Sequence, residues 1–132
     1  MITAEMIPAL QGVVPSTVCT VSAEGIPNIT YISQIFYLDK QRVALSFQFM
    51  NKTWCNLQEN PRVTLILSHP ESFKIWEVQL EYQELVSDGP LFDAMDMEMA
   101  AIASMFAHIV QFKLKAALIC KVLNVKVLHH GE

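Results

Sequence analysis

Short runs of apolar, β-branched and aromatic residues, separated by polar turns, fill the first half of the chain. Three such runs cover residues 15–22, 27–38 and 42–49, with turns at residues 23–25 and 39–41. β-Branched and aromatic residues favour strands, and short polar connections favour hairpins. The pattern predicts three antiparallel strands in a meander.

The pattern changes to helical spacing further along the chain. Trp54 and Leu57 lie on one face of a short helix that Pro61 must end. After Pro90, which suits the first turn of a helix, apolar residues recur at spacings of four, four, three and four. These residues are Leu91, Met95, Met99, Ile102 and Phe106. A short helix is therefore predicted after the third strand and a longer one before the last strand, besides a brief helix near residues 4–10.

Further strands are predicted at residues 62–68, 73–87 and 110–128. In the last of these, apolar residues hold one parity up to Val122 and the opposite parity from Leu123 onward. A strand cannot change parity in this way without a bulge or a break, so we expect a bulge near residues 121–124. Six hairpin-connected strands favour a mainly β (β+α) fold built on an antiparallel barrel.

Composition limits the classes of function. A chain of 132 residues suits a single domain, here residues 1–132, and its 52% apolar content indicates a buried oligomer interface or an apolar ligand pocket. A net charge of −4 argues against nucleic-acid binding, and no apolar run is long enough to span a membrane. The first twelve residues do not resemble a secretory signal, and three cysteines without a CxxC pair are expected to be reduced, mostly buried thiols. We therefore expect a cytoplasmic protein.

A polar triplet, Asn51-Lys52-Thr53, stands where the third predicted strand gives way to the short helix. Asn51 is placed to cap this helix, whose first N–H groups have no intrahelical partner and form an anion site together with Lys52. Phosphate is the obvious candidate anion. The alternative is that Asn51 only caps the helix and that Lys52 is solvated.

Three segments carry a resemblance to a known family: TVCTVSAEGIPNITYIS, the hairpin centred on Asp39, and NKTWCNLQENPRVTLIL. The most specific part is the polar-basic-polar triplet followed by Asn-Pro-Arg-Val. These segments, with residues 88–92 and the long last strand in the same order, resemble the flavin-binding split-barrel superfamily related to pyridoxamine 5'-phosphate oxidase. The resemblance implies a six-stranded antiparallel split β-barrel that forms a homodimer, with two FMN molecules in clefts between the subunits.

The resemblance also implies which residues contact FMN. They are Ile32, Ser33, Gln34, Ser46, Phe47, Asn51, Lys52, Thr53 and Trp76. Lys52 would be the counter-ion of the phosphate, and Asn51 and Thr53 would donate hydrogen bonds to it. The strand at Ser33 and Gln34, with Ile32, would run beside the isoalloxazine ring.

The remaining contacts implied by the resemblance come from two other strands. Ser46 and Phe47 would lie close to the ribityl chain or the phosphate, and Trp76 would cover the ring from the partner subunit. Each has a structural alternative: Ser46 as an outward strand residue, Gln34 as a residue that pairs across the sheet, and Trp76 as a core or dimer contact.

The chain contains no Ser/His/Asp set, no HExxH motif and no Gly-rich phosphate loop, so no residue is assigned as a catalytic acid or base or as a metal ligand. The resemblance implies an FMN-dependent oxidoreductase acting on an unknown small molecule. The ending VLHHGE lacks the basic, Arg- and Trp-containing segment of pyridoxamine phosphate oxidases, which argues against vitamin B6 oxidation. The alternatives are a non-catalytic flavin- or haem-binding or sensing module, as one part of a longer natural protein, and a cofactor-free dimerisation domain.

Overall fold

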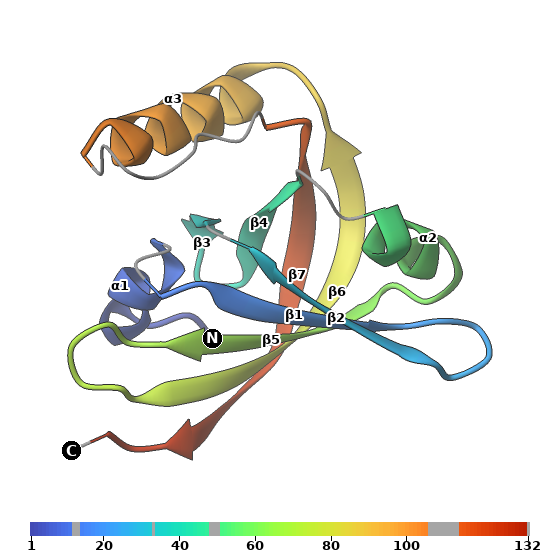
Figure 1. Ribbon diagram of the computed structural model, residues 1–132, viewed down its shortest axis with the longest axis horizontal. Helices are drawn as coiled ribbons and strands as arrows, with labels where there is room; N and C mark the ends of the chain where they lie inside the picture. The colour runs from blue at the N-terminus through green and yellow to red at the C-terminus, as the bar shows by residue number, and fades with distance from the viewer. Residues whose placement is uncertain (12–13, 33, 48–50, 106–113, 132) are drawn as a thin grey trace.

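The computed structural model describes residues 1–11, 14–32, 34–47, 51–105 and 114–131. Within these residues, an antiparallel sheet of seven strands, ordered β2-β1-β5-β6-β7-β4-β3, curls into a barrel (Figure 1). The strands are β1 (Ser16–Val21), β2 (Pro27–Ile32), β3 (Ile35–Asp39), β4 (Arg42–Phe47), β5 (Arg62–Ser68), β6 (Ile75–Val86) and β7 (Ala116–His129).

The helices stand at the positions that the sequence predicts. A 3-10 turn, η1 (Ala4–Met6), continues into α1 (Ile7–Leu10), α2 (Asn51–Glu59) follows β4, and α3 (Pro90–Met105) precedes β7. Figure 1 shows α3 above the barrel and α2 beside it, next to β6. Among the helices that can be described, none is both long and apolar enough to cross a membrane.

The segment predicted as one strand over residues 27–38 is two strands, so the six-strand count and the three-strand meander are wrong. β2 ends at Ile32 and pairs with β1, whereas β3 begins at Ile35 and pairs with β4 at the opposite end of the sheet order. A sheet that closes into a barrel brings its two edges together. The chain crosses from one edge of the sheet to the other between Ile32 and Ile35. The residues before and after this crossing have the same propensity for strands, so the sequence pattern does not reveal it.

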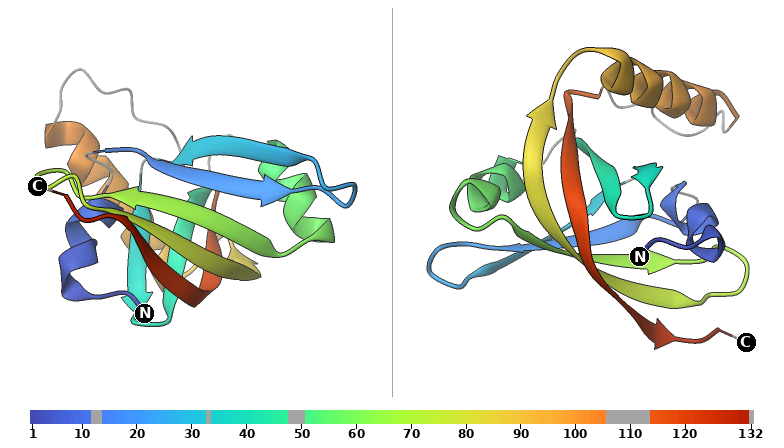
Figure 2. Two further views of the ribbon diagram at one scale, coloured as in Figure 1. Left: turned by 90° about the horizontal axis from the view of Figure 1, so that it is seen from below. Right: turned by 180° about the vertical axis from the view of Figure 1, so that it is seen from behind.

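The bulge predicted near residues 121–124 is confirmed. Gln79 of β6 pairs with Asn124, and the next residue, Leu80, pairs with Val122, which leaves Leu123 as the extra residue. β6 and β7, which lie side by side in Figure 2, are the longest strands of the sheet that the structure describes. Because the bulge shifts the alternation by one residue, the end of β7 keeps its apolar side chains turned toward the core.

Two apolar clusters occupy the two faces of β4. Leu45 belongs to the barrel interior, whereas Ala44 belongs to an outer cluster that also contains Met95 of α3 and Ala117 of β7. Successive strand residues point to opposite faces, and both faces of β4 are buried, which explains its nearly continuous apolar sequence. Leu91, Met95 and Met99 of α3 therefore pack in the core, as their spacing predicts, and the side chains of Ile102 and Phe106 lie outside the described residues.

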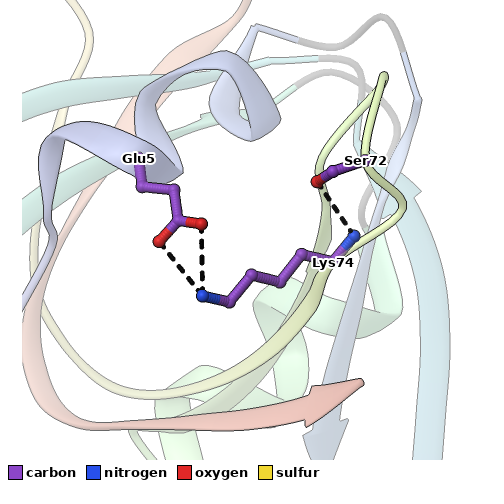
Figure 3. A network of polar contacts seen from close by, with 3 residues as sticks. All are labelled: Glu5, Ser72 and Lys74. Atoms are coloured by element: carbon purple, nitrogen blue, oxygen red, sulfur yellow. Dashed lines mark hydrogen bonds and ion pairs between the residues drawn. The ribbon is translucent and has the colours of Figure 1, made fainter. Parts of the chain in front are cut away.

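The N-terminal segment packs against the same barrel. Ile2, Met6 and Leu10 are buried in the interior cluster. Lys74, just before β6, donates from Nζ to both carboxylate oxygens of Glu5 at 3.1 Å, as Figure 3 shows. The pair is partly exposed to solvent, so we attribute the position of this segment mainly to its apolar side chains.

The three cysteines are free thiols in different surroundings, and the expectation that they are mostly buried holds only for Cys120. Cys120 in β7 is buried, Cys19 is intermediate and Cys55 on α2 is exposed. Burial raises the pKa of the Cys120 thiol to about 12. Cys55 lies on the solvent side of a helix whose opposite side packs on the barrel, a distinction that the sequence spacing did not resolve.

We expect iodoacetamide to alkylate Cys55 much faster than Cys120 in the native protein, because the thiolate is the attacking species. On unfolding, the pKa of the Cys120 thiol returns to about 8.5. The contribution of the buried neutral thiol to the free energy of unfolding is therefore complete below about pH 8.5. It is lost as the pH rises toward 12. Peptide mass spectrometry measures both alkylation rates. Equal rates at the two cysteines would contradict the prediction.

Candidate functional site

Helix α2 is fixed across the β1–β2 hairpin by two side-chain hydrogen bonds. Asn28 Nδ2 donates to Thr53 Oγ1 at 3.2 Å, and Asn56 Nδ2 donates to Thr20 Oγ1 at 3.1 Å. Thr20, Thr53 and Asn56 are buried. Because a buried polar group without a partner is destabilising, these pairs define how the first turns of α2 sit on the sheet.

Apolar contacts complete the attachment of α2. Leu57 is buried in the barrel interior, and the Trp54 ring meets the Tyr82 ring edge to face with centroids 5.9 Å apart. Burial, followed by the nearby Cys120 and Glu84, raises the pKa of the Tyr82 phenol. The predicted apolar face of this helix is therefore its contact face, and the opposite face carries Lys52 and Cys55 to solvent.

The first turn of α2 contains the predicted polar triplet. Helix α2 is described from Asn51 onward, and residues 48–50 lie outside the described part of the chain, so the role of Asn51 as a cap stays a prediction. Lys52 is exposed and Thr53 is buried against β2. The first N–H groups of a helix lack intrahelical partners and carry the positive end of its dipole, so this turn and the Lys52 ammonium suit an anion.

Thr53 has a second role besides the predicted one. Its hydroxyl accepts a hydrogen bond from Asn28, and a hydroxyl that accepts one bond also has a proton to donate. Asn28, Asn56 and Thr20 were not predicted as site residues. The one signal for Asn28 was a polar residue in the Gly-x-Pro-Asn turn at the start of a strand-forming run.

A second group of predicted residues meets where the chain crosses from β2 to β3. The Ser46 hydroxyl donates to the Gln34 carbonyl oxygen at 2.9 Å, and the Ser46 N–H donates to the same oxygen at 3.4 Å. Ser46 and Gln34 are 1% and 3% exposed. Ser46 has the parity of Ala44, on the outer face of β4, but it is buried there and not solvated.

The side-chain amide of Gln34 is buried without a hydrogen-bond partner. Neither Oε1 nor Nε2 contacts a donor or acceptor in the part of the chain that the structure describes. Gln34 thus pairs across to β4 through its backbone carbonyl, in agreement with the alternative, whereas its side-chain amide does not. This amide offers a donor and an acceptor, and the first turn of α2 by itself suits an anion.

The two groups are close along the chain. Ser46 precedes Asn51 by five residues, which reach at most about 18 Å when fully extended. Of the other predicted contacts, Ser33 lies outside the described residues, as do the side chains of Phe47 and Asn51. The site therefore rests on residues of β4, the β2–β3 crossing and the first turn of α2.

Ile32 and Trp76 lie in the barrel interior. Both belong to the inner cluster, with exposed fractions of 5% and 3%, and Lys74 Nζ stands 5.5 Å from the centroid of the Trp76 ring. This placement agrees with the alternative that Trp76 is a core residue. Its suggested contact with a cofactor on a partner subunit stays a prediction.

Comparison with known proteins gives one partial sequence relative. An uncharacterized protein of Methanocaldococcus jannaschii is 36% identical over 66 residues, which are 48% of this chain and 44% of that protein. The match thus spans less than half of the length of that relative. It supports common ancestry of the matched part and carries no function.

Solved structures share the fold over most of the chain. An FMN-binding protein from Syntrophomonas wolfei subsp. wolfei has a TM-score of 0.75 at 18% identity, covering 96% of this chain and 88% of that one. An F420 reductase has a TM-score of 0.67 at 11% identity, covering 96% and 98%. HutZ, a haem storage protein from Vibrio cholerae, has a TM-score of 0.55 at 16% identity, covering 89% and 87%. These likenesses establish the split-barrel fold.

The family follows from the sequence itself. The sequence model of the pyridoxamine 5'-phosphate oxidase family matches residues 2–122, which include every strand from β1 to β6 and the start of β7. The match contains both the α2 turn and the Gln34–Ser46 pair. The chain therefore belongs to the pyridoxamine 5'-phosphate oxidase family.

Proposed function

We propose that this protein binds FMN and acts as a flavin-dependent oxidoreductase on a small molecule. The observation that carries the proposal is the first turn of α2, where Lys52 is exposed beside a helix N-terminus fixed to β2 through Thr53. Family membership and the fold shared with an FMN-binding protein support the same cofactor.

Each part of the site has a distinct role in this proposal. Lys52, with the first N–H groups of α2 and the side chains of Asn51 and Thr53, holds the phosphate. The β2–β3 crossing, from Ile32 to Gln34, borders the ring, and the end of β4 borders the ribityl chain. FMN supplies the redox chemistry when bound, and the protein residues orient it and exclude water from it.

A binding measurement tests the proposal directly. We expect the purified protein to carry flavin absorption bands, or the colourless protein to quench the fluorescence of added FMN until one FMN is bound per chain. Reduction of that flavin by a nicotinamide nucleotide, with turnover of an added acceptor, supports the oxidoreductase. A protein that neither contains nor binds FMN contradicts the proposal.

Haem is the second candidate ligand, because the haem storage protein HutZ shares the fold. Haem iron usually needs an axial ligand such as histidine. His69 and His129 each accept backbone N–H groups at Nδ1, at 3.1–3.2 Å. Ligation of iron through Nε2 would put the proton on Nδ1 and break these bonds, which disfavours His69 and His129 as iron ligands. Titration with haem, followed by its absorption band, distinguishes the two ligands.

We also propose that the protein is a homodimer. Ile29 and Tyr31, on one face of edge strand β2, are 64% and 70% exposed. Two large apolar side chains side by side on an edge strand favour burial against another surface. A second copy is the partner that the family resemblance implies, with FMN between the subunits.

A further inference from the structure

A cavity of about 560 Å³ lies between the N-terminal segment and the β3–β4 hairpin. It is lined by residues 1–4 and Ile7 on one side and by Tyr37 and Lys40 on the other. Its volume falls within the range of about 300–1,000 Å³ that is typical of small-molecule sites. Figures 1 and 2 show α1 and α2 on opposite sides of the barrel, so this cavity is separate from the first turn of α2.

The walls of this cavity are mostly apolar. Ile2 is buried in the interior cluster and Ile7 packs against it, so this wall is part of the core. The Ile2 N–H donates to the Lys40 carbonyl oxygen at 2.9 Å, which joins the two walls and satisfies both backbone groups. Met1 and Tyr37, by contrast, remain 53% and 40% exposed. Apolar surface that stays open to solvent in a cavity favours a ligand with an apolar body.

Lys40 gives the cavity a positive charge. Among the described residues, no carboxylate forms an ion pair with its ammonium, although two acidic residues lie near the walls in sequence. Asp39 accepts a hydrogen bond from Arg42 Nε at 3.0 Å. Both carboxylate oxygens of Glu5 accept from Lys74 Nζ at 3.1 Å, as Figure 3 shows. These acids are thus engaged with other cations, and the charge of Lys40 is complementary to an anionic ligand.

A smaller cavity limits the charge at the other end of such a ligand. This cavity, of about 120 Å³, shares Ile7 and Tyr37 with the first and is also lined by Glu98 of α3. A ligand that extends from Lys40 past these shared residues would bring its far end toward the Glu98 carboxylate. A second negative charge at that end would be repelled, whereas an apolar end would not.

We propose that this cavity binds a medium-chain aliphatic monocarboxylate, with the carboxylate at Lys40 and the chain against Ile2 and Ile7. The aliphatic lining, the cation without an ion pair and the acidic residue beyond the shared wall all agree with this class of ligand. Neither a flavin nor the first turn of α2 takes part. The inference therefore goes beyond the proposed function and does not depend on it.

Calorimetric titration of the purified protein with decanoate tests the inference. We expect saturable binding of decanoate, and binding of sebacate, the dicarboxylate with the same number of carbons, about 10-fold weaker. Sebacate would place a second charge in an apolar cavity and toward Glu98. Lys40→Met should weaken decanoate binding by about 5-fold, the upper end for an exposed ion pair, and should leave the binding of uncharged decanol unchanged.

A second variant tests the cavity itself. Ala4 is exposed and lines the cavity, so Ala4→Phe should fill it without disturbing the core. We expect this variant to weaken decanoate and decanol alike, by about 10-fold or more, because the ring takes the place of the aliphatic chain. Lys126→Met, which removes an exposed lysine of β7, is the matched control and should leave both affinities unchanged. Circular dichroism should give the same thermal midpoint for all three variants without ligand.

Each other outcome overturns the inference. Decanoate that shows no saturable binding to the wild type removes the site. Equal decanoate affinities in the wild type, Lys40→Met and Ala4→Phe would place the ligand elsewhere, and equal weakening of decanoate and decanol by Lys40→Met would exclude recognition of the carboxylate. FMN titration of the same proteins keeps the two proposals apart, because a wild type that binds decanoate but not FMN contradicts the proposed function alone.

Discussion

Replacement of Lys52 by alanine should weaken FMN binding by about 10- to 100-fold and leave riboflavin binding unchanged. The estimate corresponds to the loss of one charge-assisted contact of about 1.5–3 kcal/mol at the phosphate. The side chain is exposed, so the substitution removes no buried contact and should leave thermal stability as it is. Fluorescence titration with the two flavins measures both affinities.

A control for net charge accompanies this variant. Lys126, also exposed, is on β7 and away from the triplet in sequence, so Lys126→Ala removes the same charge without the proposed contact. Added salt should reduce the difference between Lys52→Ala and the wild type, because it screens an exposed ion pair. Equal FMN affinities for the wild type and Lys52→Ala would mean that the phosphate binds elsewhere. The double variant with Asn51→Ala then tests whether the whole triplet takes part.

Replacement of Tyr31 by glutamate should weaken the homodimer by roughly 100-fold or more. A symmetric interface would contain the substitution twice, and each charge would lose its water without a partner. Because Tyr31 is 70% exposed in the single chain, the folded subunit should keep its stability. Sedimentation over a range of protein concentrations measures the dissociation constant.

Met97→Glu is the matched control for the dimer. Met97 on α3 is 73% exposed, so it introduces the same charge at a comparably exposed apolar position away from β2. We expect its dissociation constant to equal that of the wild type. A Tyr31→Glu protein that remains dimeric would place the interface on another face, and a monomeric wild type would remove the dimer proposal altogether.

Most elements could be predicted because their signals are local. β5 has the predicted bounds, residues 62–68, since Pro61 and the turn after Ser68 limit an alternating run. The bulge at Leu123 was predictable for the same reason, because the change in the alternation of apolar and polar residues can be read from consecutive positions. The break between β2 and β3 was not, since it depends on closure of the barrel by strands distant in sequence.

The site was predictable only in part. The polar triplet follows from its place between a strand and Pro61, and the family resemblance linked it to phosphate. The Asn28–Thr53 bond joins residues 25 apart in sequence and has no local pattern. The isolation of the Gln34 amide is equally invisible in sequence, because it depends on which groups the fold brings near a buried side chain.

The sheet order also determines when the protein can fold during its synthesis. β7 lies between β6 and β4, so the β3–β4 hairpin can join the rest of the sheet only after residues 116–129 have left the ribosome. Until then the nascent chain exposes one edge of β6 and one edge of β4, both of which can pair with strands of other chains. Slow translation of the last strand should therefore favour aggregation, and chaperones that shield strand edges should act on this protein before its final residues emerge.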